Sequence, residues 1–328
     1  DPFGLGGDEV PYVDFRDASG EGGQVAAITQ RQLAFLVANA LMGNSIPADD
    51  GLSAALARCA AKPSKPTAYL FSLLSLLAVL SVELGPDPAA HGSTLIGATP
   101  GAQDSTWTQR LQWSNLRPPA LCSTSNGSSC HLADFMAGGT PFQALTDIAG
   151  GVVGGGAELC DVALSQDESV VQFYSEALAF AFFAGGKGML PVPWVLLGAR
   201  RYVHDITGET SKEDRSCGRI RTKDWLNDKI SAPVAAATVS FAGHKTKLAP
   251  SAFVAVASAC TACKQDGCST IDAMNHKCDK QRRHLDADLA RWYQAYEASG
   301  YNEVMHEAFR SLVRRIGTGP WGAGVWFG

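Results

Sequence analysis

The sequence lacks a long apolar run and has no excess of positive charge. Its longest uncharged run, Thr67 to Val82, contains several serines and threonines and falls short of the roughly 20 apolar residues that a membrane-spanning helix needs. We therefore interpret it as a core helix and predict no membrane contact. The formal net charge of -5 gives no generally basic surface, so direct nucleic-acid binding is not predicted.

Common catalytic and nucleotide-binding fingerprints are also missing. No Ser-His-Asp or Cys-His arrangement stands out, and no Gly-Lys-Ser/Thr follows the glycines near residue 155, which excludes a Walker loop. The dinucleotide fingerprint lacks its third glycine after Gly154 and Gly156. Charged residues make up only 18% of the 328 positions, whereas apolar residues make up 46%, enough for a sizeable core.

The nine cysteines leave three interpretations open. Cys122 and Cys130 flank a loop with a glycosylation-type triplet at Asn126, which favours disulfides in a secreted or lumenal compartment. A zinc site is the alternative for a second cluster, with Cys260 and Cys263 joined by Cys268 and either His276 or Cys278. Unrelated thiols are the third. We prefer disulfides and predict no metal.

Strand-like and helical segments alternate in the second half of the chain, which favours an α/β layered domain. Apolar strand-like runs cover 142–149, 192–199, 232–242 and 252–258. Helices are expected at about 168–184, 281–299 and 302–315.

The first half is expected to be mainly helical. Thr29 and Gln32 form a capping box ahead of a helix with one buried face, and a second helix is expected at about 50–61. Residues 1–23 should form an extended lead-in, and 86–130 mostly irregular structure. We expect a helical accessory region over 1–130 and the α/β domain over 131–328.

Two glycine-rich segments are the main candidates for a binding site. Gly150 to Gly156 follows a strand-like run, with the acids Asp167 and Glu168 shortly beyond, and "GTGPWGAGVWFG" ends the chain at 317–328. Glycines let backbone N–H groups approach a bulky anion without interference from a Cβ atom. Two such loops at strand ends could clamp a diphosphate from both sides.

The order of these motifs resembles the poly(ADP-ribose) glycohydrolase family, whose signature is a triple glycine followed by Gln-Glu-Glu. Here Gly154-Gly155-Gly156 precedes Gln166-Asp167-Glu168, and Asp147 precedes the glycines at the family's spacing. Three further segments are similar and occur in the same order: "QRQLAFLVANAL" (30–41), "LLGARRYVHDITGET" (196–210) and "TGPWGAGVWFG" (318–328).

The resemblance implies a macrodomain-like mixed sheet flanked by helices, with an N-terminal helical extension, that hydrolyses ribose–ribose bonds of poly(ADP-ribose). Glu168 would protonate the leaving ribose oxygen and then deprotonate water, while Asp167 would orient a ribose hydroxyl. The implied ligand-binding positions are Asp147, Gly154, Gly155, Gly156, Gln166, Tyr202, Gly322, Ala323, Gly324, Val325 and Trp326. The partners would be poly(ADP-ribose), ADP-ribose and ADP-ribosylated proteins, with no cofactor.

Several positions depart from the family pattern. Asp167 replaces a glutamate, Gly150 an asparagine, and Glu209 a tyrosine. These departures keep open a second hypothesis, an ADP-ribose reader with weakened catalysis, and a third, an unrelated secreted α/β protein with structural glycine loops. The family continues beyond the position of Gly328, so we expect either a longer protein or a second chain that completes the sheet.

Two further expectations concern compartment and surface. The family is nuclear or cytoplasmic, which conflicts with the compartment that the cysteines favour, so localisation stays open between the two. Arg200 and Arg201 are expected to be exposed surface charges.

Overall fold

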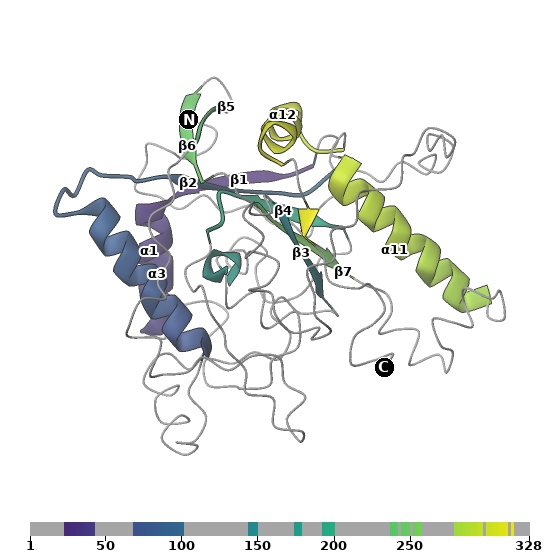
Figure 1. The fold of residues 1–328 in the computed structure, drawn as a ribbon, viewed down its shortest axis with the longest axis horizontal. Coiled ribbons are helices and arrows are strands. Elements are labelled where there is room, and N and C mark those ends of the chain that lie inside the picture. Colours follow the sequence, from purple (N-terminus) through teal and green to yellow (C-terminus); the bar gives the residue numbers. More distant parts are fainter. Residues whose placement is uncertain are drawn as a thin grey trace, which may run out of the picture.

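The structure is a computed structural model of the chain. It describes residues 23–42, 68–101, 144–149, 174–178, 192–200, 237–241, 244–249, 252–257, 279–297, 300–313 and 316–317. These residues form a mixed sheet with helices on both faces, which is an α/β architecture (Figure 1).

The sheet has six strands in the order β1-β2-β4-β7-β3-β8. They span Val25–Thr29 (β1), Thr94–Ala98 (β2), Trp194–Leu197 (β4), Ala252–Ala257 (β7), Ala144–Ala149 (β3) and Ile316–Gly317 (β8). From β1 to β7 each strand is antiparallel to its neighbour, whereas β7, β3 and β8 run parallel to one another. A separate hairpin consists of β5 (Ala237–Phe241) and β6 (His244–Leu248).

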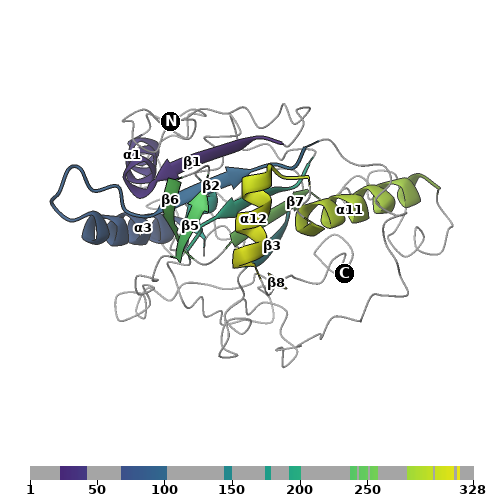
Figure 2. The same ribbon diagram turned by 90° about the horizontal axis from the view of Figure 1, so that it is seen from above.

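Five helical elements are described beside these strands. They are α1 (Gln30–Leu41), α3 (Ala68–Leu84), the 3-10 helix η2 (Ser175–Leu178), α11 (Asp279–Glu297) and α12 (Glu303–Leu312). Figure 1 shows α12 and the β5–β6 hairpin above the sheet, with η2, α1 and α3 below it. The view from above places α12 across the strands (Figure 2).

One face of the sheet, here called the α12 face, is closed by an apolar helix. Because residues three and four apart share one side of a helix, α12 turns Met305, Ala308, Phe309 and Leu312 toward the sheet, where they join Val195 and Val254 in one core cluster. The Phe309 ring lies 6.5 Å from Tyr296 of α11 and 6.1 Å from Tyr301, measured between centroids. Dispersion and apolar burial therefore hold this face together.

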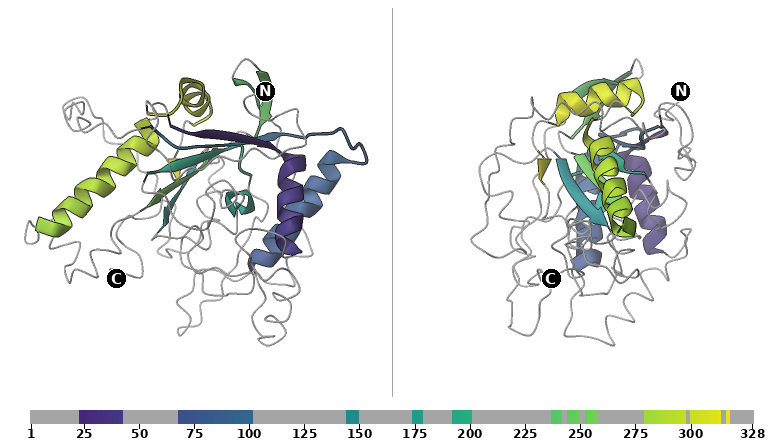
Figure 3. Two further views of the ribbon diagram at one scale, coloured as in Figure 1. Left: turned by 180° about the vertical axis from the view of Figure 1, so that it is seen from behind. Right: turned by 90° about the vertical axis from the view of Figure 1, so that its right-hand side faces the viewer.

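The opposite face, here called the η2 face, is covered by α1, α3 and η2. Helices α1 and α3 lie side by side in both views of Figure 3. Phe253 of β7 contacts Trp194 of β4 and Tyr174 beside η2, with ring centroids 5.6 Å and 6.3 Å away. Leu33, Leu76 and Leu80 are almost completely buried.

The predicted capping box at the start of α1 is confirmed. The Thr29 backbone N–H donates to Gln32 Oε1 at 2.8 Å, and the Gln32 backbone N–H donates to Thr29 Oγ1 at 3.2 Å. Both residues are buried. These two hydrogen bonds stabilise the start of the helix, because its first backbone N–H groups have no carbonyl of a preceding turn to pair with.

The core helix predicted at 67–82 is confirmed as α3, although only one side of it is buried. Leu76 and Leu80 have no exposed surface, whereas Val82 is 77% exposed. Within the ranges described, no helix is both long and apolar enough to span a membrane.

Two strands lie where no strand was expected. β2 lies inside the segment 86–130, which was expected to be mostly irregular, and β1 lies between the expected lead-in at 1–23 and the first helix. Because β2 is buried throughout and lies between two other strands, its sequence carries no alternation of polar and apolar residues. The domain division expected at residue 130 falls outside the described residues, and the sheet takes strands from both sides of it.

Several other expected elements are found among the described residues. β3, β4, β5 and β7 lie within the strand-like segments expected at 142–149, 192–199, 232–242 and 252–258. The helices expected at 281–299 and 302–315 are α11 and α12. Of the helix expected at 168–184, only 174–178 is described, as a single 3-10 turn. The helix expected at about 50–61 lies outside the described residues.

Candidate functional site

The two glycine-rich segments follow strands that are direct neighbours. The first comes after β3, which ends at Ala149, and the second comes after β8, which ends at Gly317. β8 pairs with β3 in parallel, with Leu145 opposite Gly317. Because parallel strands point their carboxyl ends the same way, both segments continue in the same direction, although β8 ends four residues before the carboxyl end of β3. In open α/β sheets this carboxyl edge is the usual place for ligands.

Asp147 lies on β3, two residues beyond the one that pairs with Gly317. Its register partner on β7 is Ala255, and it is completely buried. Side chains alternate along a strand, and Thr146 contacts Tyr296 of α11 with its hydroxyl, so Asp147 lies on the other face, with η2. Of the predicted site residues, Asp147 is the one that the described structure contains.

The other predicted site residues lie outside the described residues. They are Gly154, Gly155, Gly156, Gln166, Asp167, Glu168, Tyr202, Gly322, Ala323, Gly324, Val325 and Trp326. The same holds for all nine cysteines and for Asn126. In the part of the chain that is described, no group of three or more His, Cys, Asp or Glu side chains could hold a metal ion.

The segment 150–173, which carries both the first glycine cluster and the two acids, has described residues at each end. It leaves the sheet after Ala149 of β3 and reaches Tyr174, directly before η2. Tyr174 is 4% exposed and its ring contacts Phe253, a residue paired with Leu145 of β3. The two ends of this segment are therefore held one strand apart, on the η2 face.

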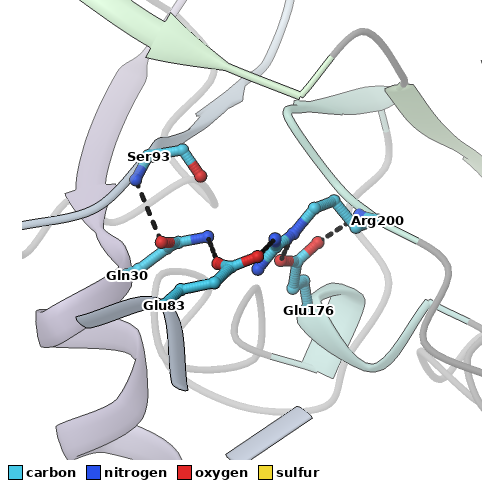
Figure 4. Close-up of polar contacts among 5 residues, drawn as sticks. All are labelled: Gln30, Glu83, Ser93, Glu176 and Arg200. Carbon is cyan, nitrogen blue, oxygen red and sulfur yellow. Dashed lines mark hydrogen bonds and ion pairs between the residues drawn. The ribbon is translucent and has the colours of Figure 1, made fainter. Parts of the chain in front are cut away.

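A buried ion-pair network lies on this face, as Figure 4 shows. The Arg200 guanidinium, which comes shortly after β4, pairs with Glu83 at the end of α3 at 2.5 Å and with Glu176 of η2 at 3.6 Å. Glu176 also accepts a hydrogen bond from the Arg200 backbone N–H. The side chains of Arg200 and Glu176 are only 5% and 3% exposed, so these two charged groups are largely shielded from water.

The network continues to α1 through Gln30. The Gln30 side-chain amide donates to the second oxygen of Glu83 at 2.9 Å and accepts from the backbone N–H of Ser93 at 3.0 Å. Gly92, at φ +67°, allows this approach, because a Cβ there would lie 2.0 Å from Gln30 Oε1. One arginine thus connects three elements of the η2 face, namely α1, α3 and η2.

The expectation that Arg200 is an exposed charge is wrong. Gly198, at φ +89°, turns the chain at the end of β4 in a conformation that favours glycine, and Arg200 follows on the buried side with only 4% of its surface exposed. The sequence holds a signal that could have indicated this pairing. Glu83 and Glu176 are isolated acids at the ends or in the middle of apolar runs, where a carboxylate needs a cationic partner.

Comparison with known proteins adds no relative. No protein-family model matches the chain, and no curated protein shows significant sequence similarity to it. The resemblance to poly(ADP-ribose) glycohydrolases therefore depends on the ordered sequence motifs alone.

Proposed function

We propose that this protein is a poly(ADP-ribose) glycohydrolase that releases ADP-ribose, with Glu168 as its general acid and base. The observation that supports the proposal most is the pairing of β3 with β8. The first residues of the two glycine-rich segments, Gly150 and Gly317, are 167 positions apart in the sequence, and a common function requires the segments to meet. Both segments continue from neighbouring strands in the same direction, the second from a point opposite Leu145, four residues before β3 ends at Ala149.

The ligand's diphosphate would be bound by backbone N–H groups of both segments. A glycine-rich turn at the carboxyl end of a strand offers such donors without side chains in the way. The formal net charge of the chain is -5, so recognition of an anion has to come from local donors of this kind. Asp147, two residues before the end of β3, would be a further ligand-binding position, as the resemblance implies.

Hydrolysis would proceed on the Glu168 carboxyl group. As an acid it would protonate the leaving ribose oxygen, and as a carboxylate it would then take a proton from the attacking water. Asp167 would orient the ribose hydroxyl beside it. The ligand's own diphosphate would stabilise the positive charge that develops on the ribose between these steps.

The proposed fold is macrodomain-like, with the ADP-ribose-binding part over residues 131–328. The six-stranded mixed sheet with helices on both faces supports a fold of this kind at the level of architecture, and residues 1–130 contribute β1 and β2 to that sheet as well as the helices α1 and α3. The substrates would be poly(ADP-ribose) and ADP-ribosylated proteins.

A reader of ADP-ribose without efficient hydrolysis is the second candidate. Asp167 favours it, because the shorter side chain places the carboxylate one methylene further back than the glutamate of the family. This candidate shares the binding site and differs only in turnover.

The test is ADP-ribose release from poly(ADP-ribose) by the wild-type chain and by Glu168→Gln, with calorimetric titration of ADP-ribose into both. A catalytic Glu168 predicts a loss of release of at least about 100-fold with little change in affinity. The control is Glu307→Gln, which removes an exposed acid of α12 and should change neither quantity. Binding without release by the wild type would favour the reader, and absence of both would refute the proposal.

A further inference from the structure

The 3-10 helix η2 depends on tertiary contacts for its position. It has four residues. The Ala177 backbone N–H donates to the Tyr174 carbonyl at 2.8 Å, which closes the turn. A single 3-10 turn is a weak structure on its own. Its position on the sheet is fixed by the buried Tyr174 and Ala177 and by the ion pairs of Glu176.

The Glu176 carboxylate fixes the position of η2 on the sheet more specifically than the apolar contacts do. Apolar side chains such as Ala177 can slide on an apolar surface, whereas a carboxylate that accepts from one backbone N–H and pairs with the same residue's guanidinium has one position. Arg200 is in turn held by Glu83 of α3. The position of η2 is therefore set directly by Arg200 at the end of β4, while Glu83 contacts the guanidinium and not η2.

We propose that Arg200 and Glu176 are positioning residues for the catalytic Glu168, which lies eight residues before Glu176 in the sequence. The inference rests on the proposed function. The chain from Ala149 to Tyr174 holds the glycines and the acids, and its return to the sheet is defined by η2. A shift of η2 would move the acid relative to a diphosphate bound at the carboxyl edge.

The energetics of buried ion pairs agree with a positioning role. A buried pair adds little net stability compared with apolar residues of the same size, because desolvation offsets the Coulomb attraction. The surrounding face is apolar, with Phe253, Trp194 and Leu196 almost completely buried. A network of two carboxylates and one guanidinium is therefore better explained by the specific geometry that it imposes than by its contribution to stability.

The two carboxylates offer a matched pair of variants. Glu176→Gln and Glu83→Gln each remove one of the two negative charges that pair with the Arg200 guanidinium, but only Glu176 belongs to η2. We expect Glu176→Gln to lower kcat for ADP-ribose release by about 10- to 100-fold, the cost of a small misplacement in an active site, with KM changed by less than about threefold. Glu83→Gln should lower kcat by less than about threefold, since η2 keeps its own bonds to Arg200.

Hydrogen–deuterium exchange supplies a readout that does not need activity. Backbone amides of residues 166–178 should exchange faster in Glu176→Gln than in Glu83→Gln, while those of α12 should be unchanged in both. Arg200→Lys is the reserve variant if Glu176→Gln does not fold, because it keeps the charge but has a single nitrogen for two carboxylates. It should show the same selective increase in exchange.

The outcomes separate this inference from the proposed function. Equal kcat for the two variants, or a loss of kcat explained by the fraction of unfolded protein, would overturn the positioning role. Unchanged exchange at 166–178 in Glu176→Gln would overturn it as well. If the wild type neither binds nor hydrolyses its substrate, the proposed function fails and with it the link to Glu168, whereas selective exchange would still support the attachment of this segment by Glu176.

Discussion

The two faces of the sheet are held by different forces. The α12 face is closed by apolar and aromatic side chains, with Phe309 of α12 between Tyr296 and Tyr301. The η2 face has an apolar core as well, but its three covering elements are connected through the charged Arg200. The apolar face tolerates small adjustments in packing, whereas the charged contact fixes one geometry. The segment with the proposed catalytic acid returns to the sheet on the second face.

The largest expected effect is on the α12 face. Phe309→Ala removes a buried ring from the centre of the core cluster and should lower the free energy of unfolding by about 3–5 kcal/mol, measured by urea denaturation. Phe35→Ala on α1 is the matched control, since Phe35 is 62% exposed and should cost less than about 0.5 kcal/mol. Similar losses in both variants would mean that the α12 face is not the main source of stability.

The next effect distinguishes charge from packing on the η2 face. Arg200→Met leaves the Glu176 carboxylate buried without its guanidinium partner and should lower the free energy of unfolding by about 3 kcal/mol. This is the low end of the range for a broken buried ion pair, because the second partner, Glu83, is partly exposed and keeps some contact with water. The double variant Arg200→Met/Glu176→Leu should recover much of this loss in urea denaturation, because an apolar pair avoids the desolvation cost.

Recovery of stability should not bring recovery of turnover. If Arg200 and Glu176 position η2, the double variant stays defective in ADP-ribose release although it is stable. Full turnover in the double variant would show that apolar packing alone can hold η2 in place.

The smallest effect is a pH dependence on the α12 face. Burial raises the pKa of Tyr301 and of Tyr296 above the ordinary tyrosine value. In the unfolded chain both hydroxyls ionise near pH 10, while the folded chain keeps its protons to higher pH. The stability contributed by the neutral forms is thus complete below about pH 10 and falls as the pH rises, by at most about 1.4 kcal/mol per pH unit for each tyrosine.

Thermal denaturation at pH values from 8 to 11 measures this dependence, because this interval includes the ordinary tyrosine pKa near 10. Tyr301→Phe should flatten the alkaline decline, while costing about 1 kcal/mol at neutral pH through the lost hydrogen bond to the Ala295 carbonyl. An equally steep decline in the variant would show that these buried hydroxyls do not govern alkaline stability.

The same contrast explains which parts of the structure the sequence could predict. The α12 face follows from local rules: Met305, Ala308, Phe309 and Leu312 recur at helical spacing, so the helix and its buried side were predictable. The capping box at Thr29 is equally local. In contrast, β2 is buried on both faces and reads as a short apolar stretch among prolines and glycines, so its period is not visible.

The candidate site stays a prediction from residue types, because all of its residues except Asp147 lie outside the described ranges. The adjacency of β3 and β8 was not predictable, since it joins residues far apart in the sequence. The partners of Arg200 are likewise distant, 24 positions from Glu176 and 117 from Glu83. Such pairings depend on the topology of the whole sheet, which local patterns do not determine.

The most direct test of the account is a crystal structure of the chain soaked with ADP-ribose. The account predicts the diphosphate between residues 150–156 and 318–328, at the carboxyl ends of β3 and β8, with the Glu168 carboxyl group facing the distal ribose. Ligand bound elsewhere, or Glu168 directed away from the sugar, would contradict the central claim that two neighbouring strands present one hydrolytic site.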